Sequence, residues 1–175
     1  CTTEKLASEP AAIVIPNRSP APAPVIDMTA ETMSAGPSME FSLDGGRTWT
    51  PADDTVSVSG MAGASLMLRY AHTDDTLHGE SAIIAIPARL AAPDVSADLR
   101  SGKFSAPEGT EFSTDGKTWG KIPASIGEDL LGKTVFFRLP ATDKNFASHT
   151  VEVALPLRSD GPVLSLNKEA LTVNT

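Results

Sequence analysis

Cysteines, aromatic residues and clusters of basic residues are all scarce in this chain of 175 residues. Cys1 is the sole cysteine, so no disulfide can form within the chain, and one terminal thiol says little about the redox compartment. Aromatic residues make up only 5% of the chain, so aliphatic side chains must fill most of any core. No apolar run approaches the roughly 18 residues of a transmembrane helix. We therefore expect no direct insertion into a membrane.

The charge of the chain is acidic and evenly spread. The formal net charge is −8, and no cluster of lysine and arginine reverses it locally. A negative surface repels phosphate groups, so nucleic acid and anionic membrane surfaces are poor partners. A hydrophobic content of 41% is nevertheless enough for packed cores, which argues against wholesale disorder.

An internal repeat dominates the sequence. Residues 2–18, 73–89 and 142–158 align without a gap, and each stretch begins with threonine and ends in an apolar residue followed by Pro-x-Arg. The starting threonines are Thr2, Thr73 and Thr142, which lie 71 and then 69 residues apart. Chance agreement of this kind is improbable, so the chain contains tandem repeats of about 70 residues.

The repeat extends upstream of these stretches. The residues Phe-Ser-Leu-Asp-Gly-Gly-Arg-Thr-Trp at 41–49 recur, one residue shorter, as Phe-Ser-Thr-Asp-Gly-Lys-Thr-Trp at 112–119. A proline-rich linker at 19–24 marks one junction. We therefore predict four segments: the end of a preceding repeat at 1–18, complete repeats at 19–90 and 91–159, and the start of a following repeat at 160–175.

Short alternating segments predict the fold of each repeat. Apolar residues occupy every second position at 66–70, 135–139 and 151–155, which is the period of half-buried strands. The Asp-Gly pairs at Asp44 and Asp115 favour hairpin turns. Several short strands in about 70 residues, with no sustained helical period, indicate an all-β chain of two tandem, small, antiparallel β-sandwich modules of immunoglobulin or fibronectin type III character.

The two hairpins resemble the Asp-box, a structural turn of sialidases and many unrelated β proteins. The resemblance implies that serine, aspartate and threonine side chains tie the turn and that tryptophan packs beneath it. It implies no catalytic role. The missing residue leaves the geometry of the second turn open, and a calcium ion at Asp44 or Asp115 would need further oxygen donors. The residues concerned are Ser42, Asp44, Thr48 and Trp49 in the first hairpin, and Ser113, Asp115, Thr118 and Trp119 in the second.

Each whole repeat resembles the modules of large surface proteins of Gram-positive bacteria. The first repeat matches at 40–49, 66–74 and 84–93, and the second at 111–119, 135–143 and 147–158. The resemblance implies an extracellular or cell-surface protein whose fibronectin-like or immunoglobulin-like modules act as spacers or adhesive arms. The resemblance does not imply a ligand. From the repetition itself we expect a monomer within a longer array.

Two loops whose sequences differ between the repeats, at 72–78 and 117–121, are candidate ligand loops. Their candidate residues are His72, Asp74, Asp75 and His78 in the first repeat, and Lys117 and Lys121 in the second. Two histidines in one loop do not complete a tetrahedral metal set, so we predict no metal and no cofactor. An isopeptide bond from Lys103 or Lys133 to Asn145 would require burial beside a carboxyl group.

The sequence thus favours a non-catalytic spacer or stalk, because no constellation of nucleophile and base is present. The alternative is an adhesive module that binds a host protein or a glycan. A glycan platform needs several exposed aromatic rings, and most of the aromatic residues here occupy repeat-equivalent positions.

Overall fold

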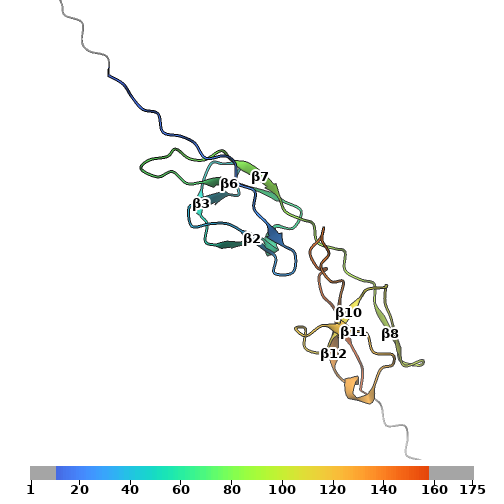
Figure 1. The fold of residues 1–175 in the computed structure, drawn as a ribbon. Helices are drawn as coiled ribbons and strands as arrows, with labels where there is room; N and C mark the ends of the chain where they lie inside the picture. The colour runs from blue at the N-terminus through green and yellow to red at the C-terminus, as the bar shows by residue number, and fades with distance from the viewer. Residues whose placement is uncertain (1–10, 158–175) are drawn as a thin grey trace, which may run out of the picture. The chain divides into compact units, whose positions relative to one another are not determined.

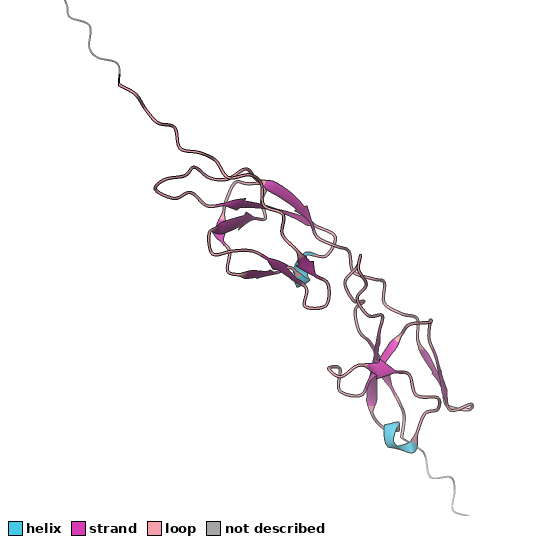
Figure 2. Ribbon diagram, in the orientation of Figure 1, coloured by secondary structure: helices cyan, strands magenta, loops and turns pink. Residues whose placement is uncertain are grey.

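The structure is a computed structural model, and it describes residues 11–157. The described residues form short antiparallel strands and two single-turn 3-10 helices (Figures 1 and 2), which confirms the predicted all-β class. None of the helices in this part of the chain has the length and apolar character needed to cross a bilayer.

The chain divides into two compact units. Unit 1 consists of Cys1–Arg89 together with Ala141–Phe146, and unit 2 consists of Leu90–Pro140 and Ala147–Thr175. The division after Arg89 lies one residue from the predicted boundary at 90/91. The segment Ala141–Phe146 belongs to unit 1, whereas the sequence repeat assigns it to the second module. The predicted terminal pieces lie outside the described residues, except for residues 11–18.

Unit 1 is a sandwich of two sheets. One sheet has the order β1-β2-β5, and the other has the order β4-β3-β6-β7, with every pairing antiparallel. The elements of unit 1 are β1 (Ile26–Asp27), β2 (Thr32–Ser34), β3 (Met39–Ser42), β4 (Thr50–Pro51), β5 (Thr55–Ser57), the 3-10 turn η1 (Ser59–Met61), β6 (Ser65–Tyr70) and β7 (Ala82–Ala85).

The core of unit 1 lies between these sheets. Leu66 and Leu68 of β6 are buried, and the intervening Met67 is only partly covered, as expected for a strand with one face on a core. Met33 of β2 and Val56 of β5 enter the same core from the other sheet. Alternation along each strand therefore selects which residues the sandwich buries.

Unit 2 has a four-stranded sheet in the order β11-β10-β12-β13 and a two-stranded sheet of β8 and β9. Phe137 of β12 is fully buried, and the rings of Phe104 and Phe112 pack against it with centroids 5.1 and 5.5 Å away. The elements of unit 2 are β8 (Ser96–Asp98), β9 (Lys103–Ser105), β10 (Glu111–Ser113), β11 (Gly120–Lys121), the 3-10 turn η2 (Glu128–Leu130), β12 (Thr134–Arg138) and β13 (Val151–Ala154).

Candidate functional site

The first hairpin is held by its own polar side chains. The Asp44 carboxylate accepts hydrogen bonds from the backbone N–H groups of Arg47 (2.9 Å) and Thr48 (2.9 Å), and from the Thr48 hydroxyl (2.6 Å). The Ser42 hydroxyl donates to Asp44 and accepts from the N–H of Gly46 (2.8 Å). These bonds, with that from the Thr48 hydroxyl contributing most, hold the pKa of Asp44 well below its ordinary value.

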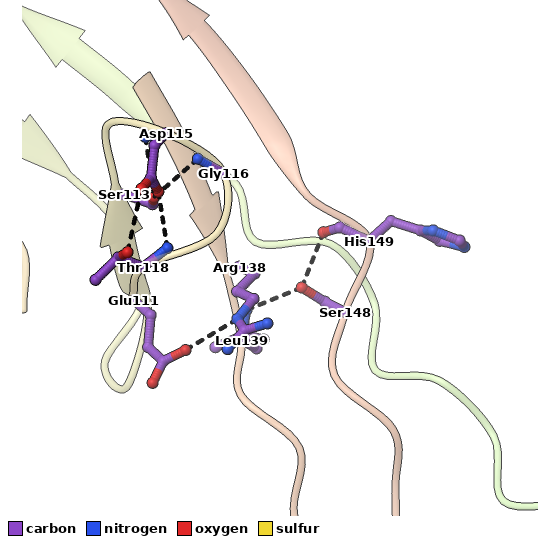
Figure 3. Close-up of polar contacts among 9 residues, drawn as sticks. All are labelled: Glu111, Ser113, Asp115, Gly116, Thr118, Arg138, Leu139, Ser148 and His149. Atoms are coloured by element: carbon purple, nitrogen blue, oxygen red, sulfur yellow. Dashed lines mark hydrogen bonds and ion pairs between the residues drawn. The ribbon is translucent and has the colours of Figure 1, made fainter. Parts of the chain in front are cut away.

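The second hairpin makes the same set of bonds with one residue fewer. The Ser113 hydroxyl accepts from Gly116 N–H at 2.9 Å, and the Asp115 carboxylate accepts from Thr118 N–H at 2.7 Å (Figure 3). The carboxylate also accepts from Lys117 N–H at 2.8 Å. The backbone N–H of Thr118 contributes most to a pKa of Asp115 that also lies well below its ordinary value. Gly116, at φ 70°, turns the chain where the first hairpin uses two glycines.

A tryptophan and an ion pair adjoin each hairpin. The Arg69 guanidinium lies 3.7 Å from the centroid of the Trp49 ring, and its Nε donates to Glu40 at 2.6 Å. The second repeat places Arg138 4.2 Å from the Trp119 ring centroid, with its Nε 2.9 Å from a Glu111 oxygen. Since β3 faces β6 and β10 faces β12 in register, glutamate and arginine are cross-strand neighbours in both sheets. Both hairpins are thus anchored to the outer face of a sheet.

The predicted ligand loops gather only in part. The rings of His72 and His78 meet edge to face at 4.7 Å, and His78 Nδ1 lies 3.1 Å from a Glu40 oxygen without hydrogen-bond geometry. Asp74 and Asp75 are exposed at the tip of this loop. Residues 11–157 contain no group of three or more His, Cys, Asp or Glu side chains that could hold a metal.

The lysine positions form no common site with this loop. Lys117 belongs to the turn of the second hairpin, and Lys121 lies on β11 opposite Glu111. Lys103 and Lys133 are exposed, so they lack the burial that an isopeptide bond with Asn145 would require. The Asn145 amide instead donates to the carbonyl of Ala88 at 3.1 Å.

The residue with the clearest structural role is one that sequence reasoning left unassigned. Phe146, encoded in the second repeat, is fully buried in the core of unit 1. Its backbone N–H donates to the carbonyl of Ala88 at 3.0 Å, and it forms a parallel bridge with Arg89. We call Ala141–Phe146 the plug loop, because its last side chain closes the unit 1 core beside the end of the first repeat.

Arg89 fixes this arrangement from the outer side. Its guanidinium makes a bidentate pair with Glu31 at 2.7 and 2.6 Å, donates to the carbonyl of Ser59 at 3.2 Å, and lies 5.8 Å from the centroid of the Phe146 ring. The hydrogen bonds with Glu31 are the main cause of a raised pKa of Arg89, so the guanidinium stays protonated. Both side chains are less than a fifth exposed.

Glu31 adopts a backbone conformation that normally belongs to glycine. Its φ is +53°, and no other non-glycine residue described has a positive φ. Gly102, at φ +64°, stands at the equivalent turn of the second repeat, where its carbonyl accepts from Ile126 N–H as that of Glu31 accepts from Val58 N–H. Glu31 thus holds Arg89 from a backbone conformation that strains a residue with a side chain and that glycine adopts freely.

The same docking pattern occurs once more, at the start of the described chain. Leu77 is the repeat equivalent of Phe146; its N–H donates to the carbonyl of Asn17 at 3.2 Å, and it forms a parallel bridge with Arg18. Leu77 is 41% exposed, whereas Phe146 is fully buried. In the sequence the signal was a single apolar residue, Leu77 or Phe146, at the same register of a polar Thr-Asp-x-x loop.

No family model, curated protein or solved structure matches this chain significantly.

Proposed function

We propose that this chain is a non-catalytic spacer segment of a bacterial cell-surface or secreted protein. The observation that carries the proposal is the burial of Phe146 in unit 1. A core that is closed by a residue of the next sequence repeat links the stability of successive repeats, as expected for a linear array. An array of this kind gains length by adding repeats.

The path of the chain through unit 1 supports a spacer. Near one end of the β6–β7 ladder, Glu80 N–H donates to the carbonyl of Ser19, where the chain enters the sandwich. At the other end, Gly63 N–H donates to the carbonyl of Pro87, just before the chain leaves at Arg89. Entry and exit therefore lie at opposite ends of a strand ladder, so unit 1 contributes the length of this ladder to the reach of the chain.

The polar clusters also favour a structural role. Ser42, Asp44 and Thr48 direct their oxygens at one another and at the turn backbone, as do Ser113, Asp115 and Thr118 in the second hairpin. Glu40 and Glu111 are each paired with an arginine across the sheet. The aspartates of the hairpins thus stabilise the turns, and the glutamates stabilise the pairing of neighbouring strands.

Single-molecule pulling tests the spacer role. The full chain, held between marker domains, should unfold in discrete force peaks, with about 3.5 Å of length released per residue. Phe146→Ala should lower the force of one peak and leave the other unchanged, because Phe146 belongs to the core of unit 1 alone. Extension without resistance at either unit would contradict a load-bearing spacer.

An adhesive module is the second candidate, favoured by one hollow in unit 1. A cavity of about 350 Å³ is lined by Pro16 and by the loop that carries His72, Asp74, Leu77 and His78. A glycan array and a panel of host extracellular proteins should remain blank for a spacer. A saturable signal that is lost in His72→Ala/Asp74→Ala and retained in Lys117→Ala/Lys121→Ala would instead support adhesion.

A further inference from the structure

Among the described residues, unit 2 has an open apolar pocket beside the segment that follows β13. The pocket has a volume of about 320 Å³ and lies beside η2. Two of its leucines are strongly exposed, Leu99 by 49% and Leu157 by 79%. The remaining lining residues are Gly102, Ile126, Glu128, Leu131 and Pro156.

This pocket corresponds to the place in unit 1 that receives Phe146. Pro156-Leu157 is the repeat equivalent of Pro87-Ala88, and the Ala88 carbonyl accepts the hydrogen bond of the plug loop. Gly132 N–H donates to the carbonyls of Leu155 and Pro156, as Gly63 N–H does to those of Ile86 and Pro87. The backbone around the two places is therefore bonded in the same way.

The turn on the other side of the pocket corresponds as well. Asp98 accepts from the N–H groups of the turn that ends at Gly102, as Asp27 does in the turn that ends at Glu31. The turn η2 follows Ile126, whose N–H donates to the carbonyl of Gly102, and η1 follows Val58, whose N–H donates to that of Glu31. In unit 1 this frame encloses a phenylalanine ring, and in unit 2 it surrounds the open pocket.

We propose that the pocket of unit 2 is an acceptor for the plug loop of a further repeat that follows in the same polypeptide. The occupant is a Thr-Asp-x-x-Phe or Thr-Asp-x-x-Leu loop, whose apolar side chain enters between Leu99, Ile126 and Leu157 while its N–H donates to the Leu157 carbonyl. Burying an aromatic ring there removes apolar surface from water on both partners. This interaction surface does not depend on the spacer role.

The plug loop and its repeat equivalent at 72–77 define what the pocket accepts. Phe146 and Leu77 both form a parallel bridge to the arginine of a Pro-x-Arg ending and donate to the carbonyl that precedes it. The residues before the apolar side chain form a turn in each loop. The Thr73 hydroxyl accepts from the N–H of Thr76, and the Thr142 hydroxyl accepts from the N–H of Asn145. A preformed turn reduces the entropy lost on docking.

A chain with one repeat duplicated in register tests the proposal. Residues 1–158 are followed directly by 90–175, so the copied Phe146 stands as far from Arg158 as the native Phe146 stands from Arg89. Amide hydrogen exchange of unit 2 is compared between this chain and the original. In the extended chain we expect at least tenfold slower exchange at Ile126, Leu131 and Leu157 of the first copy, which is the copy that the added plug loop can reach. The slowing should be the same at all protein concentrations.

Two variants of the extended chain are matched controls. Phe146→Ala in the copied repeat alone should return unit 2 to the exchange rates of the original chain, and the same substitution in the native repeat should accelerate exchange in unit 1 instead. Unchanged exchange in unit 2, with dispersed resonances from the added repeat, would overturn the proposal. A slowing that grows with protein concentration would also overturn it, because the occupant would then come from a second molecule.

Discussion

Units 1 and 2 are built from the same sequence repeat, yet their cores are closed to different degrees. Among the described residues, the unit 1 core contains eight buried residues and the unit 2 core contains four, and Phe146 accounts for part of the difference. The smaller sheet has three strands in unit 1 and two in unit 2. The boundary between the sequence repeats is therefore not the boundary between the folded cores, because the core of the first repeat is completed by a residue of the second.

The turns at Glu31 in unit 1 and at Gly102 in unit 2 also differ between the closed core and the open one. Unit 1 has Glu31 in a left-handed conformation and pairs it with Arg89, whereas unit 2 has Gly102 at the equivalent turn. The strained glutamate occurs where the plug loop is in place. The comparison thus associates the ion pair with a filled acceptor.

The largest expected effect comes from removing the plug side chain. Phe146→Ala should lower the free energy of unfolding of unit 1 by about 3–5 kcal/mol, because it leaves a cavity in a closed core. Unit 2 should keep its stability, although the substituted residue is encoded in its own repeat. Residue-resolved hydrogen exchange separates the two units, which a single melting curve would not.

Leu77→Ala is the matched control for this prediction. Leu77 occupies the same position of the same loop but is 41% exposed, so its loss should cost no more than about 1 kcal/mol. Equal effects of the two substitutions would show that Phe146 acts through local loop packing, and the comparison between the units would lose its basis.

The ion pair should give the next largest effect. Arg89→Ala should destabilise unit 1 by about 1–3 kcal/mol, since it removes charged hydrogen bonds and leaves the largely covered Glu31 carboxylate without this partner. In the Arg89→Ala background, a further Glu31→Gly should restore about 1 kcal/mol by relieving the positive φ. Chemical denaturation of the single and double variants measures both terms. If Glu31→Gly destabilises unit 1 equally with and without Arg89, the carboxylate does not act through Arg89.

Local sequence patterns predict the strands far better than they predict that Phe146 closes the core of unit 1. Alternation places Leu68 and Phe137 in the cores and Arg69 and Arg138 on the opposite face, as the structure has them. The destination of Phe146 depends on which unit its loop folds onto, and periodicity within a strand carries no such information. The positive φ of Glu31 was likewise invisible, because glutamate has no preference for that region.

The two hairpins can also be compared by how their contribution to stability depends on pH. Both Asp44 and Asp115 have folded-state pKa values below the ordinary value of about 4. Their contribution to stability is therefore complete above about pH 4 and is lost as the pH falls toward the folded-state values. NMR titration of the carboxylates in the folded chain measures each pKa directly.

Threonine substitutions distinguish the two carboxylates. The Thr48 hydroxyl is the main cause of the low pKa of Asp44, at 2.6 Å, whereas the Thr118 hydroxyl lies 3.1 Å from Asp115 and is its smallest stabilising contact. Thr48→Val should raise the pKa of Asp44 more than Thr118→Val raises that of Asp115. The opposite order would mean that backbone N–H groups dominate in the first hairpin as well.

The smallest effect is expected from shortening the first turn. Deleting Gly46 gives the first hairpin the length of the second, whose serine and aspartate already bind the turn backbone with one residue fewer. The deletion also removes the acceptor of the bond from Trp49 Nε1 to the Gly46 carbonyl, at 3.0 Å. We expect a loss of about 1 kcal/mol or less in thermal unfolding, in line with one exposed hydrogen bond. A loss as large as that of Phe146→Ala would show that the two hairpins are not interchangeable, because the stack of Trp49 on Arg69 would then depend on the longer turn.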